Sequence, residues 1–531
     1  MSARLTTARR TALVSMMVVL GITATACGGS DDDDSGSSGG NQSTVQGEAK
    51  AGGSMTMLAV QDSAALDPFK AASVAVADEP RLAALYDPLF YIDAADNSVK
   101  PHMGESLKTA DNGKTWQLKL RPGVKFSDGT PLNAEAVKVN WDMHAKAETQ
   151  SQHRAIAAGL TSKVVDETTL DITPLGMPNA NLDRAVAIDL TYIASPATLA
   201  KGPDEYRNKP VGAGPFKLES WTRGSQQVYV KNENYWQKDK GLPKLDKLTI
   251  KNVPDVKQQY NTVNSGGADV FLSSDNATIA QAQKEIGVVQ RSVEGGQMIQ
   301  FNMTRPPFND PRARQAITLA LDPAGIPATL SNGYVPAKNF FSQKSPFFDP
   351  ANVQAAPDKA KAKQLFDDLE REGKKVEFTY LLPQNPSSVK VAEYMQSRLA
   401  EYKNVSMKLE PLEIGAYIEK YAIRKDFQAM LFQQWLADPE PLMFNNWFSK
   451  SPLNFIGWNN PEADAALLAG RNSTDPTARK AAYSQLQKAL VADLPVWTYA
   501  ESSIGVLFNK KITGVVQYNT GVFFMDRIGL K

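Results

Sequence analysis

The pattern of apolar and polar residues is most distinctive at the start of the chain. Basic residues at Arg4, Arg9 and Arg10 precede an apolar run over residues 12–22, and small residues follow it up to Cys27. A basic start, a short apolar run and small residues before a cleavage point are typical of an export signal. The run is too short for a membrane-spanning helix, which needs about 20 apolar residues.

The next segment, residues 28–53, carries no apolar pattern. It is rich in Gly, Ser, Asp and Gln, with consecutive aspartates from Asp31 to Asp34. A segment of this composition cannot bury apolar surface, so we expect a disordered tether that holds a folded body away from a membrane.

Alternation and helical periodicity predict the elements of that body. Residues 116–121 alternate apolar and polar positions as a half-buried strand does, and the strand is expected to resume at 124–126. Asn133 is placed to cap a helix over 134–146. The other expected strands are 55–60, 376–382, 405–409 and 427–432, and the other expected helices are 313–321 (capped by Asp310), 359–370, 388–401, 417–423 and 477–491 (capped by Thr474 or Asp475).

The alternation of strands and helices through residues 350–435 predicts an α/β lobe with a mixed sheet. Without the signal about 500 residues remain, too many for one core, so two or three domains are expected. The apolar fraction of 42% fits a soluble globular protein, and the formal net charge of +1 gives no reason to expect nucleic acid as a partner.

Cys27 is the only cysteine of the 531 residues. The sequence Ala-Thr-Ala-Cys ending at Cys27 resembles a bacterial lipobox, although Ala24 stands where the lipobox usually has Leu. The resemblance implies cleavage before Cys27 and acylation of its thiol, so that the mature chain is anchored by lipid and does not span the membrane. An ordinary secretory signal with an incidental cysteine is the alternative.

Five segments, in order along the chain, together resemble the large extracellular solute-binding proteins of ABC importers, the peptide/nickel-binding family (family 5). The segments are 118–132 (LKLRPGVKFSDGTPL) with 134–137, 212–216 (GAGPF) with 235–236, 267–270 (GADV), 301–302 with 306–316 (PPFNDPRARQA), and 458–461 (WNNP). Most of these motifs set turns and identify the architecture, and they say little about the ligand.

The resemblance implies an α/β fold of the periplasmic-binding-protein type (type II, cluster C). Two lobes close on a solute like a clamshell, and an extra subdomain is inserted beside the first. Lobe I is expected at 54–84, 194–300 and 500–531, the inserted subdomain at 85–193, and lobe II at 301–499, with a hinge near Gln300 and Tyr499.

The strongest candidate for ligand binding is the Trp-x-x-Asp sequence from Trp435 to Asp438, at the end of a predicted strand. In peptide-binding members of the family the Asp at this place pairs with the α-ammonium of the ligand, because an enclosed cation needs an opposite charge. The N–H and C=O groups of Gln434 and Leu436 are expected to pair with an extended peptide. The alternative is that Asp438 only organises the turn that follows.

Two further residues complete the predicted ligand set. Ser73 lies in the segment 70–74, where the family's first lobe places another ligand-facing loop, and Asn454 lies in lobe II. The sequence also departs from the family: the oligopeptide binders carry an Arg shortly before this Trp, whereas this chain has Phe432, Gln433 and Gln434. The departure puts recognition of a peptide carboxylate from this strand in doubt.

Other residue types give weaker signals. Most aromatic residues of the second half are expected in the core, with Trp435 as the exception; they are Trp435, Trp447, Phe448, Phe455, Trp458, Trp497 and Tyr499. His102, His144 and His153 are the only histidines, lack the spacing of a helical metal pair, and are expected at the surface. No metal site and no cofactor is expected.

These observations together predict a monomeric, lipid-anchored binding protein on the extracytoplasmic face of a cell membrane, of Gram-positive type. It would capture a peptide and deliver it to the permease and ATPase of an ABC importer. The alternatives are a non-peptide solute, such as an oligosaccharide, a metallophore or another small cationic compound, or a sensor that reports its ligand. An enzyme is not expected, because no nucleotide-binding loop and no Gly-x-Ser-x-Gly motif is present.

Overall fold

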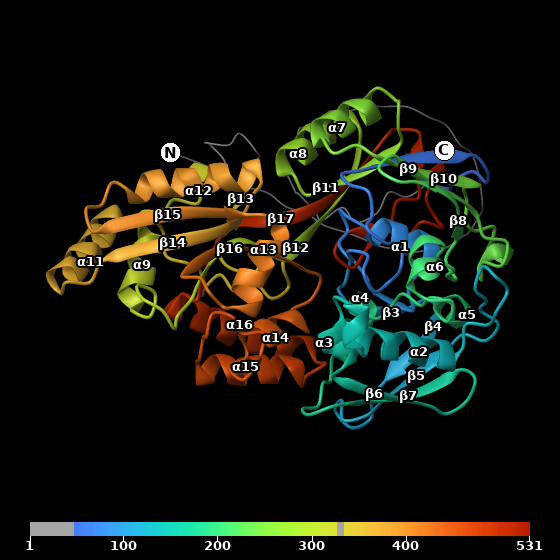
Figure 1. Cartoon of the computed structure of the whole chain (residues 1–531), viewed down its shortest axis with the longest axis horizontal. Helices are drawn as coiled ribbons and strands as arrows, with labels where there is room; N and C mark the ends of the chain where they lie inside the picture. The colour runs from blue at the N-terminus through green and yellow to red at the C-terminus, as the bar shows by residue number, and fades with distance from the viewer. Residues whose placement is uncertain (1–46, 327–333) are drawn as a thin grey trace, which may run out of the picture. The chain divides into compact units, whose positions relative to one another are not determined.

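Two long antiparallel strands, β12 (Gly287–Phe301) and β17 (Val496–Phe508), lie at the centre of the main sheet in the computed structural model (Figure 1). The structure describes residues 47–326 and 334–531. The chain divides into two units, residues 1–40 and 41–531, and every described residue belongs to the second. The predicted signal, Cys27 and most of the predicted tether therefore lie outside the described residues.

The main sheet has eleven strands among the described residues. Their order is β15 (Val405–Leu412), β14 (Val376–Pro383), β16 (Ala429–Leu436), β12, β17, β11 (Val270–Ser273), β1 (Ser54–Ala59), β10 (Lys247–Asn252), β9 (Gln226–Lys231) and β8 (Phe216–Thr222), and β13 (Val335–Pro336) pairs with β17. β14 pairs in parallel with β15 and β16, whereas β12 pairs antiparallel with β16 and β17. The predicted mixed sheet is confirmed.

The part of the sheet formed by β15, β14 and β16 is covered by helices on both faces. One apolar core joins it to α9 (Pro311–Ala320), α11 (Lys359–Arg371) and α12 (Pro386–Leu399), and another joins it to α14 (Leu442–Trp447), α15 (Pro461–Arg471) and α16 (Pro476–Asp493). Successive residues of a strand point to opposite faces. Tyr380 and Leu382 accordingly enter the first core and Leu381 the second.

Side-chain caps fix the starts of these helices, as predicted. Asp310 accepts a hydrogen bond from the N–H of Arg312, and Asp475, rather than Thr474, accepts one from the N–H of Ala478. Such bonds satisfy backbone donors that have no partner within the helix. The helix predicted at 417–423 is instead a short α13 (Ile414–Ile418) followed by a π-helical turn (Glu419–Ile423).

The other half of the sheet, from β11 to β8, shares a core with α1 (Glu79–Tyr86) and the C-terminal residues. A smaller core lies under α7 (Val256–Asn264) and α8 (Asn276–Glu285). The last residues of the predicted tether are held against this half, because the Lys50 N–H donates to the Leu530 carbonyl and the Gly52 N–H to the Lys244 carbonyl. Short elements complete it: α5 (Pro196–Leu199), α6 (Pro203–Asn208), β18 (Ile512–Thr513), β19 (Gln517–Tyr518), β20 (Val522–Phe523) and β21 (Gly529–Leu530).

Residues between α1 and α5 form a separate four-stranded sheet with its own apolar core. Its order is β4 (Gly104–Lys108), β5 (Trp116–Leu120), β7 (Thr169–Pro174) and β6 (Leu160–Val164), accompanied by β2 (Phe90–Ile92), β3 (Val99–Pro101), α2 (Ala134–Ala145), α3 (Arg154–Ala157) and α4 (Leu182–Asp189). Asn133 caps α2 as predicted. The strand expected at 124–126 is wrong: only an isolated bridge from Lys125 to Pro131 forms, because the two flanking turns leave too little chain for a ladder.

The ladder between β12 and β17 is interrupted midway. Val293 pairs with Ser502 and Gln297 with Ala500, so the intervening residues of β12 bulge away from β17. Gly295 and Gly296 lie in this bulge with φ of 95° and 103°, a region that residues with a side chain rarely adopt. The hinge predicted near Gln300 and Tyr499, and the predicted domain boundaries, stay predictions.

None of the helices within residues 47–326 and 334–531 combines the length and the apolar character needed to cross a membrane.

Candidate ligand-binding site

Asp438 lies in the loop that follows β16, two residues after the strand ends at Leu436. Its carboxylate is buried and accepts four hydrogen bonds. The Arg479 Nη2 and the Glu440 N–H donate to Oδ1 at 2.5 and 2.9 Å, and the Arg184 and Arg479 Nη1 atoms donate to Oδ2 at 2.7 and 3.0 Å. Every acceptor position of the carboxylate is therefore in use.

The two guanidinium groups also decide the charge of Asp438. Burial alone would raise the pKa of this carboxyl, but the charges of Arg479 and Arg184 outweigh burial and hold the pKa below its usual value. Arg479 comes from α16 and Arg184 from α4, so this ion-pair cluster joins the predicted lobe II to the predicted inserted subdomain. A ligand ammonium could reach Asp438 only by replacing one of these donors.

The edge of β16 away from β12 is open over its second half. β14 pairs with β16 only at Ala429 and Met430, and no other described strand lies on that side. On the other side, Gln434 pairs with Gly296 and Leu436 with Glu294. The buried Gln434 side chain leaves its Oε1 atom without a partner among the described residues. The arrangement can accept an extended backbone at the open edge.

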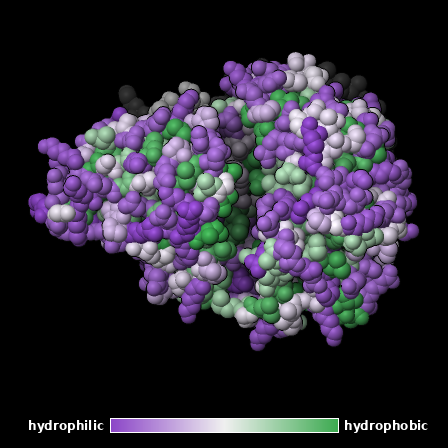
Figure 2. Space-filling view, in the orientation of Figure 1, coloured by the Kyte–Doolittle hydropathy of each residue, from purple (hydrophilic) through white to green (hydrophobic). Residues whose placement is uncertain are grey.

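Apolar side chains flank this open edge. Ile414, Ile418 and Ile423, on α13 and the turn after it, have exposed fractions of 60%, 44% and 76%. The ring of Tyr421 contacts that of Phe432 on β16, with centroids 6.1 Å apart. Figure 2 shows the surface hollowed in this region, with apolar residues gathered along the hollow on the α13 side. Such a surface suits the apolar side chains of a ligand.

A small polar cavity of about 240 Å³ lies beside the ion-pair cluster. Three segments line it: the turn at 94–97, the part of β12 from Arg291 to Glu294, and the loop at 342–346. These segments belong to the predicted inserted subdomain, lobe I and lobe II respectively, so the cavity lies where the three predicted parts meet. No sequence pattern indicated Arg291 or Glu294, because each is brought to the cavity by contacts between segments far apart in the chain.

Replacing Glu294 by glutamine should stabilise the protein more at pH 8 than at pH 5. Burial raises the pKa of Glu294 to about 8. The folded protein therefore holds this proton more tightly than the unfolded chain does, and stability is lost as pH rises from about 4.5 to about 8. A glutamine cannot ionise, so the advantage of Glu294→Gln should grow by on the order of 2 kcal/mol over this range. Thermal unfolding at both pH values measures it, with the exposed Glu393→Gln as control, and an advantage that does not change with pH contradicts the expectation.

Ser73 and Asn454 do not join this cluster through any described contact. The Ser73 Oγ lies 3.2 Å from the His153 Nε2, and the His153 Nδ1 lies 3.0 Å from the Asp189 Oδ1. Asn454 is buried, and its side chain bonds both the N–H and the carbonyl of Trp458, which fixes the loop around it. Their assignment to the ligand stays a prediction.

The expectation of surface histidines is wrong. His102 and His144 are buried, and the side chain of His153 is 10% exposed. Polar partners make burial acceptable: the Asp87 Oδ2 lies 2.7 Å from the His102 Nε2, and the Ser151 Oγ lies 2.6 Å from the His144 Nδ1. Within the described ranges no three His, Cys, Asp or Glu side chains are grouped to hold a metal ion.

The predicted core position of most aromatic residues is confirmed. Trp447, Trp458 and Trp497 are each 1% exposed, and Phe448 and Tyr499 are also buried. Trp435, the expected exception, is half-buried and packs against the core shared by β1 and α1. Trp435 therefore extends from β16 to the other half of the sheet.

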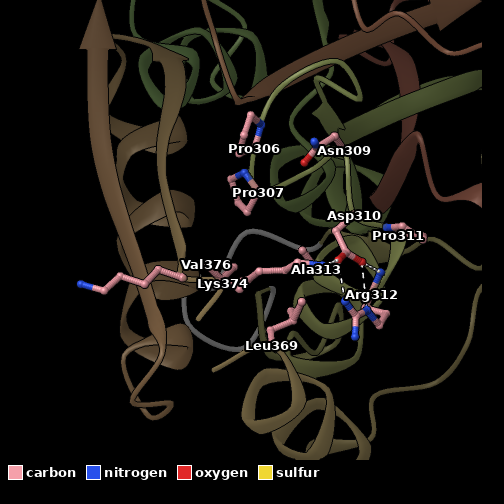
Figure 3. Close-up of a pocket in the computed structure, with 11 residues that line it drawn as sticks. Pro306, Pro307, Asn309, Asp310, Pro311, Arg312, Ala313, Leu369, Lys374 and Val376 are labelled. Carbon is pink, nitrogen blue, oxygen red and sulfur yellow. Dashed lines mark hydrogen bonds and ion pairs between the residues drawn. The ribbon is translucent and has the colours of Figure 1, made fainter. Parts of the chain in front are cut away.

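A larger groove of about 690 Å³ lies elsewhere, between the start of α9 and the start of β14 (Figure 3). β14 and β16 run in parallel, so the Val376 end of β14 is at the opposite end of the sheet from Asp438. The charged groups of the groove satisfy one another: Arg312 donates to Asp310 (Figure 3), and outside the drawn residues it also donates to Glu372, while Lys374 bonds Asp310. We assign this groove no part in solute binding.

Comparisons with known proteins agree with this architecture. The family model described as "Bacterial extracellular solute-binding proteins, family 5 Middle" matches residues 98–454. The glutathione-binding protein GsiB of Salmonella typhimurium is 27% identical over 489 residues, which cover 87% of this chain and 91% of that protein.

Solved structures show the same fold at lower identity. The oligopeptide-binding protein AppA of Bacillus subtilis, in complex with a nonapeptide, has a TM-score of 0.74 and 22% identity over 91% of this chain and 100% of that one. NikA of Brucella suis, in complex with Fe(III)-EDTA, has a TM-score of 0.75 and 21% identity over 90% of this chain and 100% of that one. The predicted fold class, the type II periplasmic-binding fold, is confirmed.

Proposed function

The chain belongs to the bacterial extracellular solute-binding proteins of family 5, and we propose from this premise that its solute is a peptide or a peptide-like compound. As a member of this family it is the solute-binding component of an ABC importer. The proposed site is the region where β16, the Asp438 loop and the small cavity meet. The solute would then be handed to a membrane permease driven by an ATPase.

The observation that carries the proposal is the open edge of β16 beside an exposed apolar surface. Gln433 and Trp435 direct their backbone groups to this edge and can pair with any extended peptide, because the backbone is common to all peptides, whereas those of Gln434 and Leu436, the residues predicted for this role, face β12. The exposed isoleucines around α13 can cover apolar side chains of varied size. These features favour a peptide over a sugar, whose many hydroxyl groups would meet apolar surface there.

The role predicted for Asp438 has to change, because its carboxylate is already paired with two arginines. We propose that the ligand's ammonium takes the place of Arg184, whose side chain is 15% exposed, while the buried Arg479 stays paired with the carboxylate. The exchange would replace one cation by another next to the same anion, so no buried charge would be left unpaired. Trp435, Ser73 and Asn454 are proposed as further ligand contacts or as supports of the loops that make them.

Relatives widen the range of solutes within the class. Of the three proteins compared above, GsiB is a glutathione-binding protein, AppA is in complex with a nonapeptide, and NikA is in complex with Fe(III)-EDTA. The Fe(III)-EDTA complex of NikA makes a non-peptide solute the alternative. Either solute would occupy the same region of β16 and the same cavity.

Native mass spectrometry of the protein as purified tests the proposal. A solute-binding protein that closes on its ligand often retains it, so we expect a complex whose extra mass is released on mild activation. A released mass that fragments into amino-acid residues supports the proposal. A released sugar or metal chelate, or a protein that carries no solute and binds none of a tripeptide library, contradicts it.

We also propose that the chain is anchored to the extracytoplasmic face of the membrane through Cys27, and that it acts as a monomer. The support is the sequence before Cys27 alone, since this residue lies outside the described ranges. Cys27→Ser should move the protein from the membrane fraction to the soluble fraction of cells, measured by immunoblot. A variant that stays with the membranes contradicts the anchor.

One set of contacts is similar to the catalytic triad of another class of protein, the serine hydrolases. Ser73, His153 and Asp189 are in contact in the order used by Ser-His-Asp enzymes. We propose that the contacts only tie the loop before α1 to α3 and α4, since the family binds and releases solutes. Labelling by a fluorophosphonate probe that is lost in Ser73→Ala would contradict this and support the hydrolase.

A further inference from the structure

Arg291 is a buried cation with a free donor. Its side chain lines the small cavity beside the Asp438 cluster, and the residue is 2% exposed. Its Nη2 donates to the Asn97 Oδ1 at 2.7 Å, but its buried Nη1 has no hydrogen-bond partner among the described residues. Leaving a charged donor unpaired in a buried place is costly, so such a donor points to a missing acceptor.

We propose that Arg291 binds a carboxylate group of the solute in this cavity. The inference rests on the proposed function for the whole solute and adds the class of group that the cavity receives. The cavity of about 240 Å³ is smaller than a whole drug-sized ligand needs, and so it takes one end of the solute. A guanidinium fork is suited to the two oxygen atoms of a carboxylate.

The fixed charges around the cavity favour an anion. Asn97, in the wall of the cavity, bonds two arginine side chains. Its backbone carbonyl accepts from the Arg184 Nη1 at 2.9 Å, and its side chain accepts from Arg291. Exposed Lys344 lines the same cavity from the opposite loop. Arg291 and Lys344 thus supply cations from two of the three lining segments, and Arg184 contacts the third segment at Asn97.

The neighbouring acids compensate these cations only in part. Asp438 is neutralised by its own two arginines, and Asp96 is engaged by Lys100 at 2.8 Å and by Ser98. Glu294 is held neutral at pH 7, since burial raises its pKa to about 8. Asp93, half-buried directly before the turn at 94–97, acts favourably on Arg291 through its charge. One added carboxylate would match the unpaired guanidinium nitrogen without a further cation.

The position of Arg291 also suits a solute bound at the end of β16. β12 is the neighbour of β16, and Glu294 pairs with Leu436, so Arg291 lies on β12 just past the last residue of β16. β16 carries no cation between Ala429 and Leu436. The adjacent strand thus supplies the positive group that this strand lacks, at the same end of β16 as Asp438, so a short solute with its ammonium at Asp438 can present a carboxylate to Arg291.

Matched pairs of probes that differ in one carboxylate test the inference. Trialanine and its C-terminal amide are compared by calorimetry on the wild type, on Arg291→Gln, which keeps a donor for Asn97, and on Arg291→Lys. The wild type should prefer the acid by roughly tenfold or more, as expected for a charge-assisted bond. Arg291→Gln should lose the preference, and Arg291→Lys should keep part of it.

The control is Arg305→Gln, which removes an equal charge from an exposed ion pair with Asp426 and should leave the preference unchanged. Circular dichroism confirms that each variant is folded. If the wild type binds neither trialanine nor its amide, the peptide proposal fails by itself. The inference is then tested by the thermal shift from succinate against succinamate, with the same variants.

Loss of the acid preference in Arg291→Gln but not in Arg305→Gln, with either pair of probes, supports the carboxylate site. Three results overturn it: an acid preference that survives in Arg291→Gln, a wild type that binds acid and amide equally, or a wild type that neither pair of probes stabilises.

Discussion

Replacing Asp438 by asparagine should lower the free energy of unfolding by about 3–5 kcal/mol, the cost of removing one partner from a buried ion pair. The carboxylate is the common partner of Arg479 and Arg184, and Arg479 is 3% exposed. An asparagine cannot neutralise either guanidinium group. Urea denaturation followed by tryptophan fluorescence at pH 7 measures the change.

The matched control is Asp426→Asn, which breaks an exposed ion pair with Arg305 at 2.7 Å. Surface pairs contribute about 0–1 kcal/mol, so this variant should denature close to the wild type. Equal free energies of unfolding for Asp426→Asn and Asp438→Asn would show that the buried cluster does not form.

The same Asp438→Asn variant distinguishes the two hypotheses for Asp438, binding of the ligand's ammonium or organisation of the loop alone. The measurement is made at a temperature where the variant is folded. If the ligand's ammonium replaces Arg184, the variant should bind a peptide with a free amino group more weakly by about 2 kcal/mol, and should bind the N-acetylated peptide as the wild type does. If Asp438 only organises the loop, both peptides should be affected equally.

Replacing Gly296 by alanine should have the second large effect, a loss of about 2–4 kcal/mol in the free energy of unfolding, since strain and a backbone clash add. Gly296 lies in the bulge of β12 with φ of 103°. A Cβ atom there would lie 2.2 Å from the carbonyl oxygen of Ala500 on β17. Neither strand can move without disturbing the pairing between the two halves of the main sheet.

Gly224→Ala is the control for Gly296→Ala. Gly224 also has a positive φ, of 74°, but a Cβ atom there would meet nothing within 4 Å. This control should therefore show only the conformational cost of about 1–2 kcal/mol. Denaturation midpoints of the two variants that coincide would contradict the close approach of β12 and β17 at the bulge.

The local elements of the fold could be predicted because their signals are local. Asn133, Asp310 and Asp475 each cap a helix that begins at the next residue, and the alternation in 116–121 gave β5. The strand wrongly predicted at 124–126 shows the limit, because three residues of alternating polarity between two turns have no ladder to join.

The site could be predicted only in part, because its contacts join distant segments. The Trp-x-x-Asp sequence placed Asp438 correctly at the end of β16. Arg184 reaches Asp438 across 254 positions of sequence, and Arg291 reaches Asn97 across 194, so no spacing rule could reveal them. The same holds for Ser73 and His153, 80 positions apart, whose contact the sequence did not suggest.

Small-angle X-ray scattering of the purified protein, with and without the solute that mass spectrometry identifies, tests most directly whether the body closes around its ligand. We expect the radius of gyration to decrease when the solute is added and to return to its former value when the solute is removed. A scattering profile that stays the same while calorimetry shows the site to be saturated would contradict it.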